Sequence, residues 1–159
     1  MTAILGHCAD LPVQAVPAGE VLISEGSEPG ALLVLISGAV TIERNGVPFA
    51  RIDHPGAVFG EMSWVLGKPA TATVRASEPV QVHVMGDPEG FLAAHPEAAV
   101  EVLRMTAARL DGLTQYLVDV KAQFAGLDGH LGMVDQILDA LVHHQAAPTH
   151  TGSVRDPEC

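Results

Sequence analysis

The sequence predicts a mainly-β domain, a sandwich or barrel, followed by a long helix and a short C-terminal helix. Two observations lead to this fold class. Between residues 21 and 85, short apolar runs alternate with turn signals about every 8–12 residues, which is typical of an all-β domain. After Gly86, apolar residues recur with helical spacing instead. A chain of 159 residues can build one compact domain with a proper core and one appended element.

The expected strands fill the first half of the chain. The runs VLIS at 21–24 and LLVLIS at 32–37 are separated by EGSEPG, whose glycines and proline suit a tight reversal. Asn45-Gly46 is the strongest hairpin signal, because both residues tolerate positive φ in a two-residue turn. In VQVHVM at 80–85, the three valines alternate with Gln and His, so we expect the valine face in the core.

The helical part has two candidate entry points, Asp87 and His95-Pro96, since proline is tolerated in a first turn. Apolar residues then repeat every seventh position in two offset rows: Leu103, Leu110, Leu117 and Phe124, and Leu113, Val120 and Leu127. This stripe favours a parallel homodimer joined through the 97–124 helix. A single amphipathic helix lying on the barrel is the alternative. A second amphipathic helix is expected at 130–145, after Asp128-Gly129 interrupts the first.

These patterns divide the chain into a β domain at 1–95, helices at 96–145 and a tail at 146–159 that we expect to be disordered. Cys8 and Cys159 show no metal-ligand spacing and fit a reducing cytoplasm. We expect no signal peptide, because no basic region precedes a long apolar core. The longest apolar run is too short to cross a membrane.

The charge balance excludes several partners. The formal net charge is −11 and the chain has only 8 Lys and Arg residues, which argues against nucleic acid and against an anionic membrane as partners of this chain alone. His54 and His83 stand alone, and no grouping of residues suggests a metal site, a cofactor or catalytic chemistry. We therefore expect a protein that is not an enzyme.

Four motifs resemble the cyclic nucleotide-binding domains of catabolite activator protein-like regulators, kinase regulatory subunits and ion channels. They are PAGEVLISEGSEPGALLVLISGAVTI at 17–42, FGEM at 59–62, ATVRA at 72–76 and FLAAHPEAAVEVLRMTAARL at 91–110. The resemblance covers about residues 17–140. It implies a jelly-roll β domain, or β-roll, followed by a long dimerisation helix and a short C-terminal helix.

The resemblance implies a phosphate-binding cassette that starts at Phe59, Gly60, Glu61 and Met62. In this family pattern, Glu61 accepts a hydrogen bond from the ribose 2′-hydroxyl, and the backbone of Met62 and Ser63 helps to hold the cyclic phosphate. Gly60 would let backbone approach a ligand closely, and a helix starting near Glu61 would direct N–H groups at a phosphate. The alternative is that Glu61 has no ligand role and is an ordinary acidic residue at a helix N-terminus, where a carboxylate interacts favourably with the helix dipole.

The cassette departs from the family pattern at one position. The usual P-R-[AST]-A-T-V reads PATATV at 69–74, so Ala70 replaces the arginine that pairs with the phosphate. A charge-assisted contact of that kind contributes about 1.5–3 kcal/mol, so we expect affinity to be about 10–100-fold weaker or more. Thr71 keeps a hydroxyl that could reach a phosphate oxygen, and Ala72 follows it. Lys68 either supplies a point charge or is a solvated turn lysine.

The sequence also predicts roles for three further residues, Trp64, Arg75 and Thr114. Trp64 either packs or covers the pocket, and packing is favoured. We expect a structural role for Arg75 on the strand that leaves the cassette. By resemblance, Thr114 falls near where the dimer partner's helix touches the base in this family.

The leading functional interpretation is a stand-alone, dimeric sensor module with weak or lost binding of cyclic AMP or cyclic GMP. The alternative is the sensor half of a catabolite activator protein-like transcription regulator whose DNA-binding domain is absent from this chain. An enzyme is the third and least favoured class.

Overall fold

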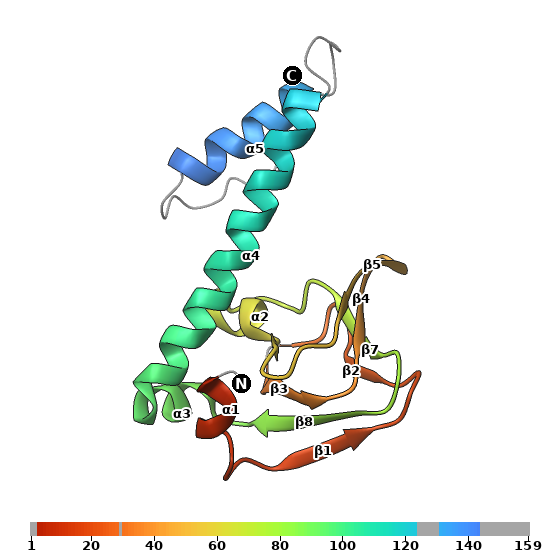
Figure 1. Cartoon of the computed structure of the whole chain (residues 1–159), viewed down its shortest axis with the longest axis vertical. Coiled ribbons are helices and arrows are strands. Elements are labelled where there is room, and N and C mark those ends of the chain that lie inside the picture. Colours follow the sequence, from red (N-terminus) through yellow and green to blue (C-terminus); the bar gives the residue numbers. More distant parts are fainter. Residues whose placement is uncertain (1–2, 29, 124–130, 144–159) are drawn as a thin grey trace, which may run out of the picture. The chain divides into compact units, whose positions relative to one another are not determined.

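The computed structural model describes residues 3–28, 30–123 and 131–143 (Figure 1). Asp128-Gly129, the 146–159 tail with Cys159, and the stripe residues Phe124 and Leu127 lie outside the described residues. The chain divides into two compact units, the first ending at Thr106 and the second beginning at Ala107. This division falls inside the long helix, and the segment boundaries given above stay predictions.

The first unit contains two antiparallel sheets of four strands each, in the orders β1-β8-β3-β6 and β2-β7-β4-β5. The strands are β1 (Val13–Val16), β2 (Val21–Ile23), β3 (Leu32–Ser37), β4 (Val40–Arg44), β5 (Val47–Ile52), β6 (Val58–Phe59), β7 (Thr73–Ala76) and β8 (Val80–Met85). Together with the long helix that follows, they confirm the predicted jelly-roll class. The hairpin prediction is also confirmed, because Asn45 and Gly46 have φ of 52° and 76° between β4 and β5.

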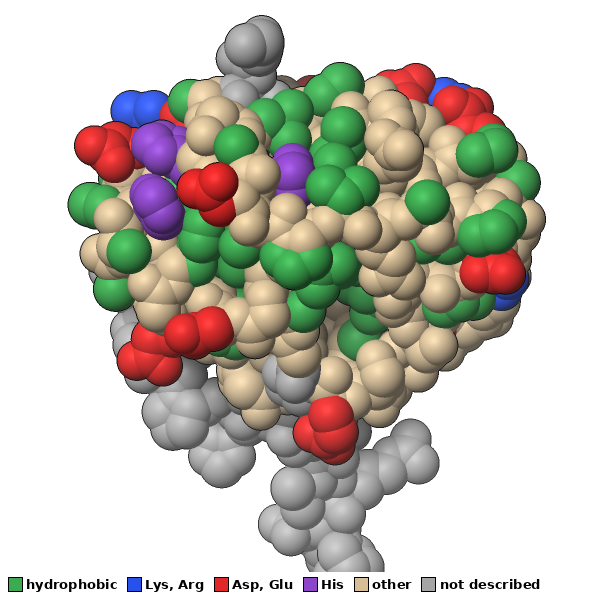
Figure 2. Space-filling model, turned by 90° about the horizontal axis from the view of Figure 1, so that it is seen from below, with side chains coloured by type: hydrophobic (Ala, Val, Ile, Leu, Met, Phe, Trp, Pro, Cys, Tyr) green, Lys and Arg blue, Asp and Glu red, His purple; other side chains and the backbone are tan. Residues whose placement is uncertain are grey.

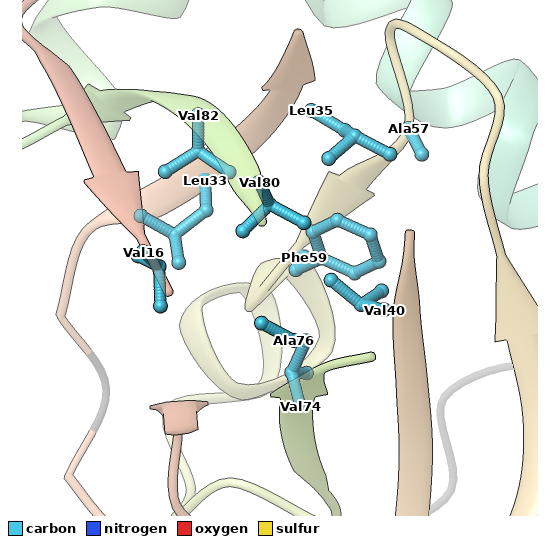
Figure 3. Packing of buried hydrophobic residues seen from close by; sticks show 10 residues of the cluster. All are labelled: Val16, Leu33, Leu35, Val40, Ala57, Phe59, Val74, Ala76, Val80 and Val82. Atoms are coloured by element: carbon cyan, nitrogen blue, oxygen red, sulfur yellow. The ribbon is translucent and has the colours of Figure 1, made fainter. Parts of the chain in front are cut away.

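The first core cluster lies between the two sheets, since its residues come from strands of both (Figure 3). It consists of Val16, Leu33, Leu35, Val40, Ala57, Phe59, Val74, Ala76, Val80 and Val82. Val84 packs against it as well, so the valine face of β8 is in the core as predicted.

The second core cluster joins the sheet β1-β8-β3-β6 to helices. Its members are Ile4, Cys8, Leu32, Val34, Val58, Met85, Leu92, Ala98 and Val102. Leu32 and Val34 of β3 face this cluster, whereas Leu33 and Leu35 face the first. A strand covered on both faces explains why residues 32–35 form an uninterrupted apolar run.

The helices begin where the sequence indicates. Between α1 (Ala3–His7) and the long helix, α3 (Pro88–Ala94) is capped by Asp87, whose Oδ1 accepts a hydrogen bond from Gly90 N at 3.1 Å. The long helix α4 (Pro96–Gln123) starts at the second predicted entry point. Cys8 is packed in the second core cluster, and burial raises the pKa of its thiol.

The second unit comprises the rest of α4 and α5 (Leu131–His143), which lies within the predicted 130–145 range. An ion pair between Lys121 and Asp135 joins the two helices. No helix in the described ranges has the length and apolarity required to cross a bilayer. On the face shown in Figure 2, Asp and Glu side chains are more widespread than Lys and Arg, in line with the net charge of −11.

Candidate ligand-binding site

A pocket of about 340 Å³ opens on the first unit, where the cassette meets the turn between β2 and β3. Its lining consists of Leu22, Ile23, Ser24, Ser27, Glu28, Gly30, Ala31, Leu33, Gly60, Ser63 and Ala70. Five of these side chains are aliphatic and three carry hydroxyl groups. The size lies at the lower end of the range of about 300–1,000 Å³ for small-molecule sites.

The turn at 24–31 forms one wall of the pocket, and backbone hydrogen bonds fix it to the cassette. Ala70 N donates to Ser27 O at 2.8 Å, and Gly26 N donates to Ala70 O at 2.8 Å. Nearby, Glu25 N donates to Thr73 Oγ1 at 3.0 Å. These bonds hold Ala70 against the turn, with its methyl group in the pocket lining and 9% of the residue exposed.

Gly60 forms the junction between β6 and the cassette helix α2 (Glu61–Leu66). Its φ of 90° belongs to the left-handed region that favours glycine. A Cβ at this position would lie 3.2 Å from Ala31 O and 3.5 Å from Ile23 Cδ1. Gly60 is therefore needed both for the chain direction and for the close approach of the cassette to the turn wall.

Of the predicted site residues, Gly60, Ser63 and Ala70 come together in the pocket. Ser63 is buried, and its Oγ donates a hydrogen bond to Lys68 O at 2.6 Å, which closes the end of α2. The side chain of Phe59 instead belongs to the first core cluster and is 3% exposed (Figure 3). Sequence reasoning grouped Phe59 with the site because it precedes Gly60, but the alternation of β6 directs it to the core.

The remaining predicted residues lie outside the lining. Glu61 is buried at the start of α2, and Met62 is exposed. Thr71 and Ala72 are half-buried, and the carbonyl of Thr71 accepts a hydrogen bond from Arg44 Nε at 2.9 Å. The ligand contacts inferred for these residues stay predictions.

Thr114 belongs to the second unit, where its hydroxyl donates to Leu110 O at 2.8 Å. Its proposed contact with a base stays a prediction. Trp64 packs against the second core cluster, which confirms the packing interpretation of this residue.

The charge of the pocket lining differs from that of a site in which a cationic side chain pairs with a phosphate. Among the described lining residues, Glu28 is the charged one, and neither lysine nor arginine is present. Lys68, two positions before Ala70, has an exposed side chain that does not contribute to the lining.

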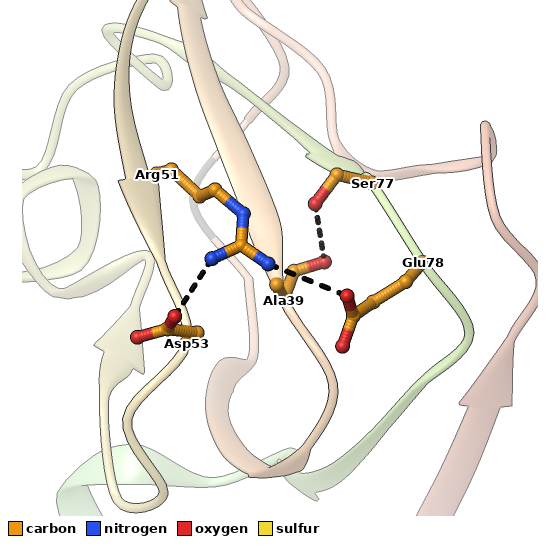
Figure 4. A network of polar contacts seen from close by, with 5 residues as sticks. All are labelled: Ala39, Arg51, Asp53, Ser77 and Glu78. Carbon is orange, nitrogen blue, oxygen red and sulfur yellow. Dashed lines mark hydrogen bonds and ion pairs between the residues drawn. The ribbon is translucent and has the colours of Figure 1, made fainter.

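Arginines of the first unit make contacts away from the pocket. Arg44 bonds to the Thr71 carbonyl, and Arg104 pairs with Glu101 at 2.9 Å. The guanidinium of Arg51 pairs with Asp53 at 2.7 Å and Glu78 at 3.3 Å (Figure 4).

Arg75 has the structural role predicted for it. Its Nε pairs with Glu43 Oε1 at 3.1 Å, and its Nη1 donates to Gly19 O at 3.0 Å. These contacts join β7 to β4 and to the residues before β2. Arg75 therefore makes structural contacts and does not belong to the described pocket lining.

Sequence reasoning missed the contribution of Ser24, Ser27 and Glu28 to the pocket. EGSEPG at 25–30 predicts a tight reversal and belongs to the opening motif of the resemblance, but no ligand contact was inferred for it. The signal that could have found them is their place in the opening motif at 17–42, which the resemblance already covered.

Comparison with known proteins identifies the domain. Residues 13–90 match the family model of the cyclic nucleotide-binding domain, and this region contains both core sheets and the pocket. The chain therefore belongs to the cyclic nucleotide-binding domain family through this region. The family is one of regulatory domains, and the resemblance inferred from the motifs is confirmed.

The chain is 35% identical over 83 residues to the acetyltransferase Pat of Mycolicibacterium smegmatis, covering 50% of this chain and 24% of the relative. It spans about a quarter of the length of the curated relatives it matches. Among solved structures, the N-terminal domain of a transcriptional regulator from Streptomyces coelicolor has 27% identity and a TM-score of 0.52, covering 79% of this chain and 87% of that one. The catabolite activator protein of Thermus thermophilus has 20% identity and a TM-score of 0.63, covering 91% and 86%.

Proposed function

We propose that this chain is a dimeric sensor module whose pocket binds cyclic nucleotides weakly. The observation that carries the proposal is the combination of an assembled pocket with Ala70 at the position of the phosphate-pairing arginine. The cassette, the turn and the strands are in place, so the site keeps its shape. The contact worth about 1.5–3 kcal/mol is missing.

A calorimetric titration of the full chain with cyclic AMP and cyclic GMP tests this function. We expect saturable binding of at least one of them, about 10–100-fold weaker than binding to the Ala70→Arg variant. Absence of binding to both nucleotides at millimolar concentration would contradict the sensor function.

Dimerisation is supported by exposed apolar residues along α4. Leu103, Leu110 and Leu113 are 67%, 48% and 51% exposed, and each occupies a position of the predicted seam. Burying a leucine side chain contributes about 1.5–3 kcal/mol before the cost of association, so several together can sustain a homodimer through the 97–124 helix.

Replacement of Leu110 and Leu117 by Glu should yield monomers, because two charges would have to be buried in the seam. The control is Ala108→Glu, which adds one negative charge at an exposed helix position outside the seam and should leave the dimer intact. Light scattering that gives the mass of a single chain for the unmutated protein would contradict the dimer.

A second candidate is the sensor half of a transcription regulator. The similarity to the Streptomyces coelicolor regulator domain, which covers most of both chains, favours it. In either case we propose a cytoplasmic protein that acts through a partner protein rather than by catalysis. With a net charge of −11, this chain alone should bind neither duplex DNA nor an anionic membrane at physiological salt.

A further inference from the structure

The described pocket lining offers an anion no cationic side chain, and this limits the class of ligand that the pocket can bind tightly. None of the described lining residues is a lysine or an arginine, and Glu28 contributes a carboxylate at the rim. An anionic group that enters the pocket without a cationic partner loses part of its hydration without compensation, which weakens its binding.

No arginine described above compensates for Ala70. Arg44, which contacts the residue after Ala70, donates its Nε to the Thr71 carbonyl. Both backbone groups of Ala70 bond to the turn. Its N–H donates to Ser27 O, and its carbonyl accepts from Gly26 N. Arg44 therefore bonds to the cassette backbone at Thr71 and is not part of the described pocket lining.

The rest of the lining suits a ligand with an apolar face and hydroxyl groups. Leu22, Ile23 and Leu33 supply aliphatic surface, and Ser24 and Ser27 supply hydroxyls. Ser27 Oγ donates to Ser24 O at 2.6 Å, so its oxygen still has acceptor capacity for a ligand hydroxyl. The volume of about 340 Å³ suits a ring system with a small polar substituent.

We propose that this pocket takes an uncharged ligand of nucleoside size in preference to a cyclic nucleotide monoanion. The proposal rests on the proposed function, because it assumes that this pocket is the ligand site, and it adds the charge class of the ligand. The same aliphatic and hydroxyl surface holds the ring and sugar, while none of the described lining side chains carries a positive charge to pair with a phosphate.

The test compares cyclic AMP with its neutral phosphate methyl ester, which lacks the negative charge and carries one added methyl group, by calorimetry on the full chain. Adenosine serves as a third probe without phosphate. We expect the neutral ester to bind at least about 10-fold more tightly than cyclic AMP, and adenosine to bind as well. Equal affinity for the two, or tighter binding of cyclic AMP, overturns the proposal and leaves the sensor function intact. Binding of none of the probes overturns both.

Glu28→Gln provides a second readout at an exposed position, so the fold should not change. Removing this carboxylate should raise the affinity for cyclic AMP by up to about fivefold, the range of a solvent-exposed charge interaction. The affinity for the neutral ester should stay within about twofold. Equal shifts for both probes would overturn the charge argument on which the proposal rests.

Discussion

The first core cluster and the pocket are built from neighbouring residues of the same elements, yet they differ in what they require of the sequence. Phe59 lies in the core and Gly60 lines the pocket, and Leu33 contributes to both. The core depends on apolar side chains that fit between two sheets. On our proposal, the affinity of the pocket for an anion depends additionally on the side chain at position 70, where this chain has alanine. A fold can therefore keep its core, its turns and its cassette while the strength and charge preference of its site change.

The largest effect in this comparison is expected in the core. Leu35→Ala should lower the free energy of unfolding by about 2–5 kcal/mol, because Leu35 is fully buried between the sheets and its removal leaves a cavity. The same substitution at Leu66, which is 58% exposed on α2, should change it by less than about 0.5 kcal/mol. Urea denaturation measures both, and equal losses would show that the core is wrongly assigned.

A smaller effect is expected where core and pocket meet. Gly60→Ala should cost about 1–2 kcal/mol of stability because of its positive φ, and it should also weaken ligand binding because the new Cβ crowds the Ala31 carbonyl. Gly67→Ala at the other end of α2 is the matched control. Its φ is also positive, at 60°, but its Cβ would meet no atom within 4 Å. Thermal unfolding and calorimetry should show stability losses in both variants and weaker binding only in Gly60→Ala. Unchanged binding in Gly60→Ala would separate this residue from the pocket.

The sequence predicted the fold well because the strands carry strong local signals. The hairpin at Asn45-Gly46, the apolar run of β3 and the Asp87 cap each depend on residues close together in the chain. Three short elements, α1, β1 and β6, were not predicted. Two of them have only four or five residues and β6 has two, so periodicity is too brief to detect.

The site was predicted less completely for a different reason. The cassette residues Gly60, Ser63 and Ala70 follow from one motif, whereas the facing wall comes from a turn that lies about 30 positions or more earlier. Only the folded chain shows that the backbones of Ser27 and Ala70 bond to each other, or that Arg44 bonds to the Thr71 carbonyl. Such long-range pairings have no local signature.

The central claim is that the pocket is assembled and that a missing guanidinium at position 70 limits the binding of anionic ligands. Calorimetric titration of cyclic AMP into the unmutated chain, Ala70→Arg and Ala70→Met tests it most directly, because Met adds length without charge. We predict that Ala70→Arg binds about 10-fold more tightly or better, that Ala70→Met shows no gain, and that Glu61→Ala in the arginine background weakens binding again. An Ala70→Arg variant that folds normally and binds cyclic AMP no more tightly than the unmutated chain would contradict the claim.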